Sequence, residues 1–434
     1  MVAVLLNAIY GTVLLLAAPW LCYRRWVQRK PIAGLWAKLT GQIERQRPGR
    51  PCLWIHAVSV GEVLQLQGLL PQLRAGHPDA ELLLTVTTGT GYDVARAKFP
   101  DCTVAWFPLD FSWAVQRALR SVRPDLVVLV ELELWPNFLL AARSLRIPVA
   151  LVNARLSPRS FAGYRKVRFL LRPLLQSLAV IGAQTTEYAD RLRSLGAPAE
   201  RLTVTGNIKF DRVELRRDNP RTQELARGFG LRAGEKIFIA GSTQETEEQL
   251  ALETWGTLRS EFPELRLILV PRHKERFEDV ARLVEQQGLP LLRRSRPELL
   301  PAGPSPVLLL DTLGELGACW GLADVAFVGG SLTQRGGQNM LEPAAYGAAV
   351  LFGPNTWNFK DIVAELLSRD AAQVVHDGTE LTAAVRTLLT DPALSAARSQ
   401  RARQFVQTQQ GATARTVTLL ESVWPRSDGL RKAV

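Results

Sequence analysis

The chain has 434 residues, of which 53 are Lys or Arg and 41 are Asp or Glu, so its formal net charge is +12. With 47% hydrophobic and 22% charged residues, the composition is that of a globular protein and excludes a disordered chain or a fibre. The length predicts two large domains or three small ones. The four cysteines form neither a CxxC pair nor a cluster with histidines, so we expect no metal site and no disulfide framework. The positive charge favours an anionic partner: a phospholipid surface, a phosphorylated substrate or nucleic acid.

The chain begins with an apolar segment that a basic segment follows. Residues 1–23 contain no charged side chain, and about 20 apolar residues suffice for a helix to span a bilayer core. Residues 24–50 hold eight basic side chains and one acid, Glu44. Because a cleaved signal peptide carries its positive charge before the apolar run, this order predicts an uncleaved membrane anchor that spans the bilayer or lies in its interface. The remaining chain would then be cytoplasmic and the N-terminus outside. A buried first helix is the alternative.

Short apolar runs alternate with helical patterns over most of the remaining chain. The expected strands of the first half are residues 52–57, 81–87, 104–107, 126–130, 149–153 and 178–182. Those of the second half are residues 236–240, 265–270, 307–310, 325–328, 349–352 and 373–375. Nearly continuous apolar strands separated by helices are typical of a parallel sheet covered on both faces. The predicted fold class is α/β, with two doubly wound Rossmann-like domains that face a cleft.

The domain boundaries follow the breaks in this alternation. We expect the first α/β domain at residues 51–212 and the second at residues 233–400. The polar stretch 213–232, which contains Pro220, is interpreted as a linker. Residues 401–434 have helical character without a strand, and we expect them to pack back on the first domain.

Polar and glycine-rich segments follow the strands of the second half. Ser242 follows the strand at 236–240, and Arg272 and His273 follow the strand at 265–270. A glycine-rich segment, 329–343, follows the strand at 325–328 and leads into a helix; its candidate binding residues are Gly336, Gly337, Gln338, Asn339 and Glu342. Backbone N–H groups of such a segment can bind a phosphate, and Glu342 could accept hydrogen bonds from a ribose. Since these segments share one edge of the sheet, they predict a nucleotide site. Alternatively they are ordinary turns, with Ser242 or Thr243 capping the next helix.

Three acidic residues follow strands of the first half. Glu62, in the segment Ser59-Val60-Gly61-Glu62, lies at the start of the helix after the strand at 52–57. The positive helix end favours its ionised form, which suits a general base, although an acid in the first turn of a helix is also common without any function. Glu131 and Glu133 follow the strand at 126–130 and could bind a sugar or lie in a solvated loop. Arg155 opens a basic stretch that extends to residue 172, which is either a solvated helix face or a contact for phosphates or lipid head groups.

Many of these segments, in this order, resemble the 3-deoxy-D-manno-octulosonic acid (Kdo) transferases of Gram-negative bacteria. The resemblance extends from about residue 33 to the C-terminal helix. The segments that carry it are 59–62 (Ser-Val-Gly-Glu), 133–137 (Glu-Leu-Trp-Pro-Asn), 153–157 (Asn-Ala-Arg-Leu-Ser), 205–211, 271–273 (Pro-Arg-His), 311–316, 327–331, 342–344 and 358–361. The resemblance implies a GT-B glycosyltransferase at the inner membrane that transfers Kdo from CMP-Kdo to a lipid A precursor. It also implies inversion at the anomeric carbon, no cofactor and no metal in the active site.

Site roles follow from the resemblance residue by residue. Glu62 matches the catalytic base. The donor would be held by Ser242, Arg272, His273, Gly314, Glu315, Gly336, Gly337, Gln338, Asn339, Glu342 and Lys209. Weaker contacts to the acceptor or sugar are expected from Glu131, Glu133 and Arg155. Gln338 and Gln244 stand where many relatives have His, which bears on donor identity because an amide cannot become a cation.

Two alternatives and several partners accompany this interpretation. The chain could be another GT-B transferase with a related nucleotide-sugar donor, or a membrane-anchored sugar-nucleotide-binding protein without catalysis. Expected partners are CMP-Kdo, the lipid A precursor and anionic inner-membrane lipids. Nucleic acid is not expected, because no aromatic-interleaved RNA motif accompanies the basic stretch.

Overall fold

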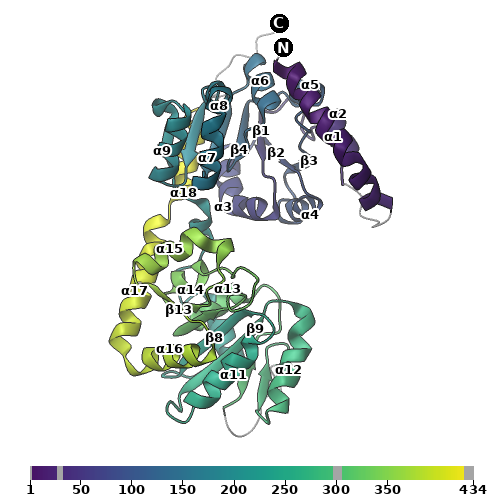
Figure 1. Ribbon diagram of the computed structural model, residues 1–434. Helices are drawn as coiled ribbons and strands as arrows, with labels where there is room; N and C mark the ends of the chain where they lie inside the picture. Colours follow the sequence, from purple (N-terminus) through teal and green to yellow (C-terminus); the bar gives the residue numbers. More distant parts are fainter. Residues whose placement is uncertain (1, 27–32, 297–304, 425–434) are drawn as a thin grey trace. The chain divides into compact units, whose positions relative to one another are not determined.

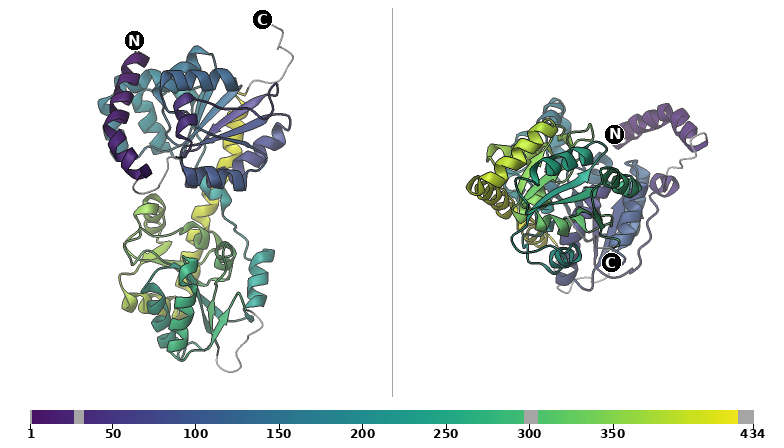
Figure 2. Two further views of the ribbon diagram at one scale, coloured as in Figure 1. Left: turned by 90° about the vertical axis from the view of Figure 1, so that its right-hand side faces the viewer. Right: turned by 90° about the horizontal axis from the view of Figure 1, so that it is seen from below.

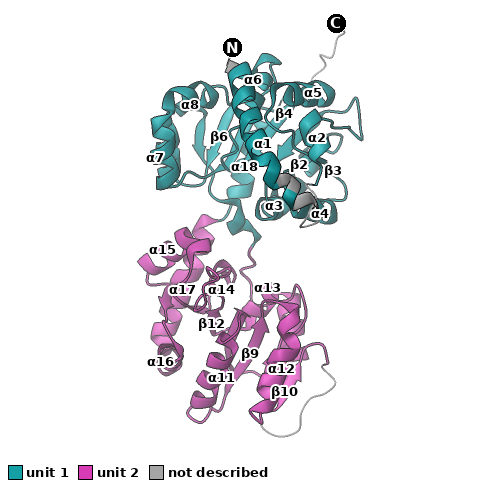
Figure 3. Cartoon of the chain, turned by 45° about the vertical axis from the view of Figure 1, so that its right-hand side comes forward, with its two compact units in different colours: residues 1–212, 410–434 teal, residues 213–409 magenta. Residues whose placement is uncertain are grey.

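The computed structural model describes residues 2–26, 33–296 and 305–424 (Figure 1). It divides the chain into two compact units: unit 1 comprises Met1–Arg212 and Gln410–Val434, and unit 2 comprises Val213–Gln409 (Figure 3). Arg29 and Lys30 of the basic segment, and residues 425–434 of the C-terminal segment, lie outside the described residues.

Unit 1 is built on a seven-stranded sheet in the order β3-β2-β1-β4-β5-β6-β7. Every strand pair in it is parallel. The strands are β1 (Cys52–His56), β2 (Glu81–Val86), β3 (Thr103–Trp106), β4 (Leu126–Val130), β5 (Val149–Ala154), β6 (Val180–Ala183) and β7 (Leu202–Val204). The helices are α1 (Val2–Trp26), α2 (Leu35–Thr40), α3 (Val60–Gly76), α4 (Gly89–Lys98), α5 (Ser112–Val122), α6 (Pro136–Ser144), α7 (Pro158–Lys166), α8 (Arg168–Leu175), α9 (Thr186–Leu195) and α18 (Ala412–Glu421).

The strands of unit 1 are apolar throughout because helices cover both faces of the sheet. In β1, Trp54 belongs to the hydrophobic cluster on one face, while Leu53 and Ile55 belong to the cluster on the other. This is the alternation of side chains along a strand. The helix α18, from the end of the chain, contributes Leu420 to the second cluster, next to Leu66 and Leu69 of α3.

Unit 2 is also built on a seven-stranded sheet, in the order β10-β11-β9-β8-β12-β13-β14. Every strand pair in it is parallel. The strands are β8 (Lys236–Thr243), β9 (Leu265–Pro271), β10 (Leu291–Arg293), β11 (Val307–Leu309), β12 (Val325–Val328), β13 (Ala349–Phe352) and β14 (Ala372–Val374). The helices are α10 (Pro220–Gly228), α11 (Glu247–Leu258), α12 (Phe277–Gln286), α13 (Leu316–Cys319), α14 (Leu341–Tyr346), α15 (Lys360–Ser368), α16 (Gly378–Thr390) and α17 (Pro392–Gln409).

The predicted fold class, α/β with two doubly wound parallel sheets, is confirmed. Two short edge strands, β7 and β10, were not expected. The stretch 213–232, interpreted as a linker, lies within unit 2, where α10 packs against α13. Its Asn219 caps α10 by accepting a hydrogen bond from the Thr222 N–H. In the last segment of the chain, α18 packs on α3 of unit 1.

The helix α1 is apolar and lies alongside the rest of unit 1 (Figures 1 and 2). It is the one candidate membrane span in the part of the chain that the structure describes: residues Ala3–Trp20 have a mean hydropathy of 1.7. None of this segment is fully buried. The expected apolar N-terminal helix is therefore present.

Candidate active site

The sheet of unit 1 has its topological switch point between β1 and β4. β1 pairs with β2 on one side and with β4 on the other, so the chain leaves these neighbouring strands in opposite directions. Ligands of open parallel sheets bind outside the carboxyl ends of the strands at such a point. Glu62 follows β1, and Glu131 and Glu133 follow β4. The topology therefore brings the three predicted carboxylates of this unit together.

The start of α3 holds the Glu62 carboxylate in place. The hydroxyl of Ser59, the N-cap residue, donates to Glu62 Oε1 at 2.8 Å and accepts from the Glu62 N–H at 3.4 Å. The N–H of Val58 donates to Glu62 Oε2 at 2.8 Å. This arrangement is close to the reciprocal capping box that a Ser followed three residues later by a Glu predicts. It fixes a side chain that is only 9% exposed, and each carboxylate oxygen keeps a further lone pair for a proton.

Burial controls the ionisation of these carboxylates. It raises the pKa of Glu62, and the charge of Glu131 adds to the rise, while the Val58 N–H and the Ser59 hydroxyl oppose it. Burial also raises the pKa of Glu133 to about 7, with the charge of Glu62 as the second cause. The hydrogen bonds at the start of the helix favour the ionised Glu62, but loss of hydration outweighs them and the net pKa is raised. A carboxylate of raised pKa is nevertheless a better proton acceptor near neutral pH.

A chain of amide side chains connects this site with the following loops. Gln65 of α3 donates to Glu131 Oε1 at 3.4 Å, and its own oxygen accepts from the Asn153 amide at 2.8 Å. Gln184 donates to the carbonyl of Asn153 and accepts from Asn207, each at 3.0 Å. Glu131 and Asn153 have φ angles of 62° and 54°. Such left-handed conformations are costly for residues other than glycine and cluster at functional sites.

Arg155 and Lys209 are the remaining predicted residues of unit 1. Arg155 is exposed, directly after β5. Lys209 lies in a short 3-10 helix, Ile208–Arg212, and its N–H donates to Asn207 Oδ1 at 3.1 Å. Lys209 therefore belongs to unit 1, whereas the other residues predicted to hold the donor belong to unit 2.

Sequence reasoning missed His56, the last residue of β1. It is fully buried and stacks on Phe107 with 3.7 Å between ring centroids. Burial lowers the pKa of His56 to about 3, so the ring is neutral. Nδ1 lies 3.0 Å from the carbonyl of Thr85, and among the described residues Nε2 has no hydrogen-bond partner. A polar residue at the end of an apolar strand was the available signal. Among the residues that the structure describes, no group of three His, Cys, Asp or Glu side chains could hold a metal ion.

The predicted residues of unit 2 follow the carboxyl ends of four strands that are neighbours in the sheet, β11, β9, β8 and β12. Ser242 lies near the end of β8 with a φ of 56° and is buried. Arg272 and His273 follow β9 and are exposed. Gly314 and Glu315 follow β11, and the segment with Gly336, Gly337, Gln338, Asn339 and Glu342 follows β12. β8 continues through Thr243, so neither Ser242 nor Thr243 caps the next helix; the residue at the N-cap of α11 is Thr246.

A buried carboxylate occupies the first part of the glycine-rich segment. Glu247, at the start of α11, accepts hydrogen bonds from the backbone N–H groups of Gln244 (2.8 Å), Gly330 (2.7 Å), Ser331 (3.0 Å) and Leu332 (3.0 Å). It is fully buried. The N–H groups that residues 330–332 could offer to a phosphate are thus taken by the protein itself. A nucleotide phosphate must therefore use donors further along the segment or on the neighbouring strand ends.

The later part of the segment holds Glu342 and Gln338. Glu342 Oε1 accepts from the Asn339 amide at 3.0 Å, and Asn339 Oδ1 accepts from the N–H of Leu341, the first residue of α14. The amide of Gln338 lies over Gly330, where a Cβ would come within 3.3 Å of its nitrogen. The Gly337 N–H donates to the carbonyl of Gly330 at 2.8 Å.

Glu315 is engaged in an ion pair. Arg294 contacts it at 2.9 Å, and the Thr312 hydroxyl donates to the same carboxylate. Burial alone would raise the pKa of Glu315, but these two partners lower it. Glu315 therefore stays ionised and fixes the loop after β11.

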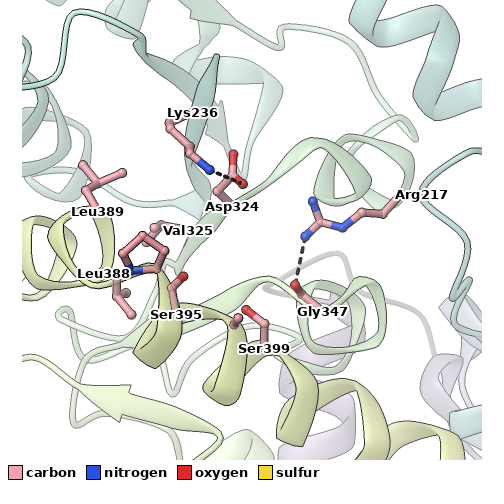
Figure 4. Close-up of a pocket in the computed structure, with 11 residues that line it drawn as sticks. Arg217, Lys236, Asp324, Val325, Gly347, Leu388, Leu389, Ser395 and Ser399 are labelled. Carbon is pink, nitrogen blue, oxygen red and sulfur yellow. Dashed lines mark hydrogen bonds and ion pairs between the residues drawn. The ribbon is translucent and has the colours of Figure 1, made fainter. Parts of the chain in front are cut away.

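A pocket of about 260 Å³ lies at the opposite, amino edge of this sheet (Figure 4). Its charged residues are already paired within the unit. Arg217 donates to the carbonyls of Tyr346, Ala323 and Gly347, and Lys236 contacts Asp324 at 3.8 Å. No residue predicted to bind the donor lines it, so we assign no role in the reaction to this pocket.

Comparison with known proteins gives a matching family and similar relatives. The family described as 3-deoxy-D-manno-octulosonic-acid transferase (kdotransferase) matches residues 34–212. A 3-deoxy-D-manno-octulosonic acid transferase from Haemophilus influenzae is 35% identical over 381 residues, which cover 86% of this chain and 88% of the relative. Its counterpart from Bordetella pertussis is 38% identical over 380 residues, or 85% of this chain and 86% of the relative.

Among solved structures, a UDP-GlcNAc 2-epimerase from Neisseria meningitidis, bound to UDP-GlcNAc, has a similar fold. It is 13% identical, covers 86% of this chain and 100% of its own, and has a TM-score of 0.57. At this identity the likeness concerns the fold alone.

Proposed function

Because this chain belongs to the family of 3-deoxy-D-manno-octulosonic acid (Kdo) transferases, we propose that it transfers Kdo from CMP-Kdo to a lipid A precursor. It is a glycosyltransferase by family membership and acts in lipopolysaccharide synthesis. The acceptor is a precursor of the lipid IVA type, and the reaction takes place at the cytoplasmic face of the inner membrane.

The observation that carries this proposal is the environment of Glu62. Its carboxylate follows β1 at the switch point of unit 1, is fixed by Ser59 and Val58, and has a pKa raised by burial. A fixed carboxylate of raised pKa has the properties of a general base for a hydroxyl nucleophile. It lies within residues 34–212, the region that the family matches.

The reaction is an in-line displacement that inverts the anomeric carbon. The primary hydroxyl oxygen of the acceptor sugar attacks the anomeric carbon of Kdo, and the bond from that carbon to the phosphate oxygen of CMP breaks. Glu62 takes the hydroxyl proton as the new carbon–oxygen bond forms. CMP leaves with the electron pair of the broken bond, so no oxidant or reductant is required.

Residues at the carboxyl edge of the unit 2 sheet hold the CMP leaving group. Arg272 supplies a positive charge beside the phosphate, and Ser242 and the N–H of Gly336 supply further hydrogen bonds, which stabilise the charge that develops on departure. The Gly337 N–H is not among these donors, because it is bonded to Gly330. Glu342 binds the ribose.

The test is turnover by the purified full chain with CMP-Kdo and tetraacyl lipid A precursor, followed by CMP release and by mass analysis of the lipid product. Glu62→Gln removes the proton acceptor, because an amide is not basic near neutral pH. We expect kcat to fall about 10²–10⁴-fold, the usual contribution of a general base, with CMP binding unchanged. The matched control is Glu187→Gln, an acid in the first turn of α9 whose side chain is 77% exposed, which should keep full activity.

The same assays separate the alternatives. A folded wild type that releases no CMP, or a Glu62→Gln variant as active as the wild type, would contradict the proposal. Competition of UDP-sugars with CMP-Kdo for the donor site would identify a related transferase with a different donor. Donor binding without turnover in the wild type would identify a non-catalytic binding protein.

A further inference from the structure

The helix α1 contacts the rest of unit 1 along one face only. Residues that are partly covered recur at spacings of three and four, which is the pattern of one helix face. They are Ala3, Leu6, Asn7, Tyr10, Gly11, Leu14, Ala17 and Ala18. The residues between them are exposed, so the helix lies lengthwise against unit 1, next to α5 (Figures 1 and 2).

Two polar side chains of α1 make specific hydrogen bonds with unit 1. The Asn7 amide donates to Ser112 Oγ at 2.7 Å, and its oxygen accepts from the Ser112 N–H at 3.0 Å and from the Asn137 amide at 3.2 Å. The Tyr10 hydroxyl donates to Asp110 Oδ2 at 3.0 Å. Phe111, at the N-cap of α5, makes no capping bond with its side chain. Asn7 therefore supplies the cap of α5 from a position far away in the sequence.

These contacts argue against a spanning arrangement. A helix that crossed the bilayer would leave its first two turns in or beside hydrocarbon, where a polar side chain without a partner is costly. The N–H of Ser112 would also lose its acceptor, and the buried Asp110 would lose one of its donors. When α1 is docked on the rest of unit 1, each of these polar groups has a hydrogen-bond partner.

The opposite face of α1 is apolar and exposed. Its large side chains are 49% to 77% exposed; they are Val4, Leu5, Ile9, Val13, Leu15, Leu16 and Trp20. An exposed apolar surface of this length marks a contact with a partner or a membrane. In the sequence, Arg24, Arg25, Arg29 and Lys30 follow it directly, and such basic clusters bind anionic lipid head groups.

Two exposed tryptophans, one on α5, which α1 contacts, and one on α2, which also contacts α5, indicate which kind of partner covers this surface. Trp36 on α2 is 74% exposed and Trp113 on α5 is 53% exposed. The Trp113 indole donates to the carbonyl of Leu39 in α2 at 3.1 Å, and its ring stacks on Phe111, which in turn meets the ring of Tyr10 edge-on. Tryptophan is enriched where a protein meets the boundary between lipid and water.

We propose that α1 lies in the plane of the membrane, docked on unit 1 through Asn7 and Tyr10, with its exposed apolar face in the lipid. The inference rests on the membrane association in the proposed function and specifies its geometry. The occupant of the exposed face is a bilayer that contains anionic phospholipid. One consequence is that the N-terminus lies on the same side of the membrane as units 1 and 2, in contrast to the topology of a spanning anchor.

Crosslinking in native membranes tests the docking. In a Cys22→Ser background, Asn7→Cys and Ser112→Cys place two thiols at neighbouring positions, and the cysteines Cys52, Cys102 and Cys319 are buried. A short bifunctional thiosulfonate should link the pair within one chain in most molecules. The matched control pair, Thr12→Cys with Ser112→Cys, should not react, because Thr12 lies on the exposed face.

A topology measurement completes the test. A protease-sensitive epitope placed before Met1 should be protected in intact spheroplasts and cleaved in inverted membrane vesicles. Cleavage in intact spheroplasts together with absence of the 7–112 link would overturn the proposal in favour of a spanning helix. A 7–112 link that joins two chains would overturn it in favour of a second copy on this face. Kdo transfer by the same membranes is measured separately, so failure of the docking and failure of the proposed function are distinguishable.

Discussion

The carboxylates of Glu62, Glu131 and Glu133 are close enough for the charge of one to raise the pKa of another. The charge of Glu131 raises the pKa of Glu62, and the charge of Glu62 raises the pKa of Glu133, which burial already raises, to about 7. These carboxylates are therefore electrostatically coupled. With a pKa of about 7, the Glu133 carboxyl is partly protonated near neutral pH.

This coupling predicts different pH profiles for two similar substitutions. Glu131→Gln removes a charge that raises the pKa of Glu62, so the acidic limb of kcat/KM against pH should shift to lower pH. Glu133→Gln serves as the matched control and should leave this limb in place, because the charge of Glu133 is not among the causes that raise the pKa of Glu62. The measurement is kcat/KM from pH 5 to pH 9, which reports the ionisations of the free enzyme. Equal shifts in both variants, or none in Glu131→Gln, would contradict the assignment.

The raised pKa of Glu133 also predicts how the stability of unit 1 depends on pH. Its ordinary value is 4.5 and its value in the fold is about 7, so between these limits the folded state binds more protons than the unfolded state. Stability therefore falls as pH rises through this window and is constant above it. Urea unfolding is monitored through amide exchange in β4 at pH 5 and at pH 8. From pH 5 to pH 8, the free energy of unfolding should fall more for the wild type than for Glu133→Gln. A wild type that gains stability relative to the variant over this range would contradict the prediction.

The sequence alone predicted the position of these carboxylates, after β1 and β4, better than it predicted their environment. Glu62 stood out because it is an acid in the first turn of a helix that directly follows an apolar strand, and both features belong to the local sequence. Its raised pKa depends on burial by residues that are distant in sequence, so the helix dipole, which is local, suggested the opposite shift. Gln65 and Gln184 gave no local signal, since they become part of the site only through the amide network around Asn153.

In unit 2, Glu247 links α11 to the segment after β12. A carboxylate that accepts four backbone N–H groups acts as an internal anion, and its hydrogen bonds are stronger than those between neutral groups. It explains why the turn after β12 can be rich in glycine and still be ordered: a Cβ at Gly329 would come within 2.8 Å of Glu247 Oε2. The segment is thus preorganised by the protein before any nucleotide arrives.

Replacement of this carboxylate should loosen the segment without removing a residue assigned to the donor. Glu247→Gln brings an amide N–H₂ toward backbone donors, and we expect a loss of about 2–4 kcal/mol in local stability. The measurement is hydrogen–deuterium exchange in residues 329–332, which should become faster. Glu253→Gln, on the exposed side of the same helix, is the matched control and should change nothing there. Unchanged protection in Glu247→Gln would show that other contacts hold the segment.

The predicted strands and helices agree with the structure where their signal was long and periodic. The parallel central strands are continuous apolar runs and were found within a few residues of their observed ends. β7 and β10 have three residues each and lie at sheet edges, so they are too short to give such a run. The stretch 213–232 looked like a linker because it is polar. It belongs to unit 2 because Asn219, Thr222 and Arg217 bond to residues about 100 positions further along the chain.

At the scale of the described chain, α5 and α18 each begin with the help of a side chain from a distant segment. Asn7 accepts from the first N–H of α5, and Asp211 accepts from the N–H groups of Gly411 and Thr413 at the start of α18. Neither Phe111 nor Gly411, the residues at the two N-caps, makes a capping bond with its side chain. Remote capping ties α1 and α18, the first and last described helices, to the rest of unit 1. No pattern in the local sequence could have predicted it.

Asp211 lies where the chain passes from unit 1 to unit 2, and Gly411 lies where it has just returned. Asp211→Asn keeps the shape of the side chain but removes its charge and one acceptor, so the start of α18 should lose about 0.5–2 kcal/mol, the usual value of a cap. Because α18 packs on α3 and Thr413 lies against Gly68, the loss should reach the helix that carries Glu62. We expect faster amide exchange in α18 and α3 and a lower kcat, with CMP binding unchanged. Asp218→Asn, an exposed position in unit 2, is the matched control. A variant in which exchange increases in α18 but not in α3 would show that the two helices respond independently.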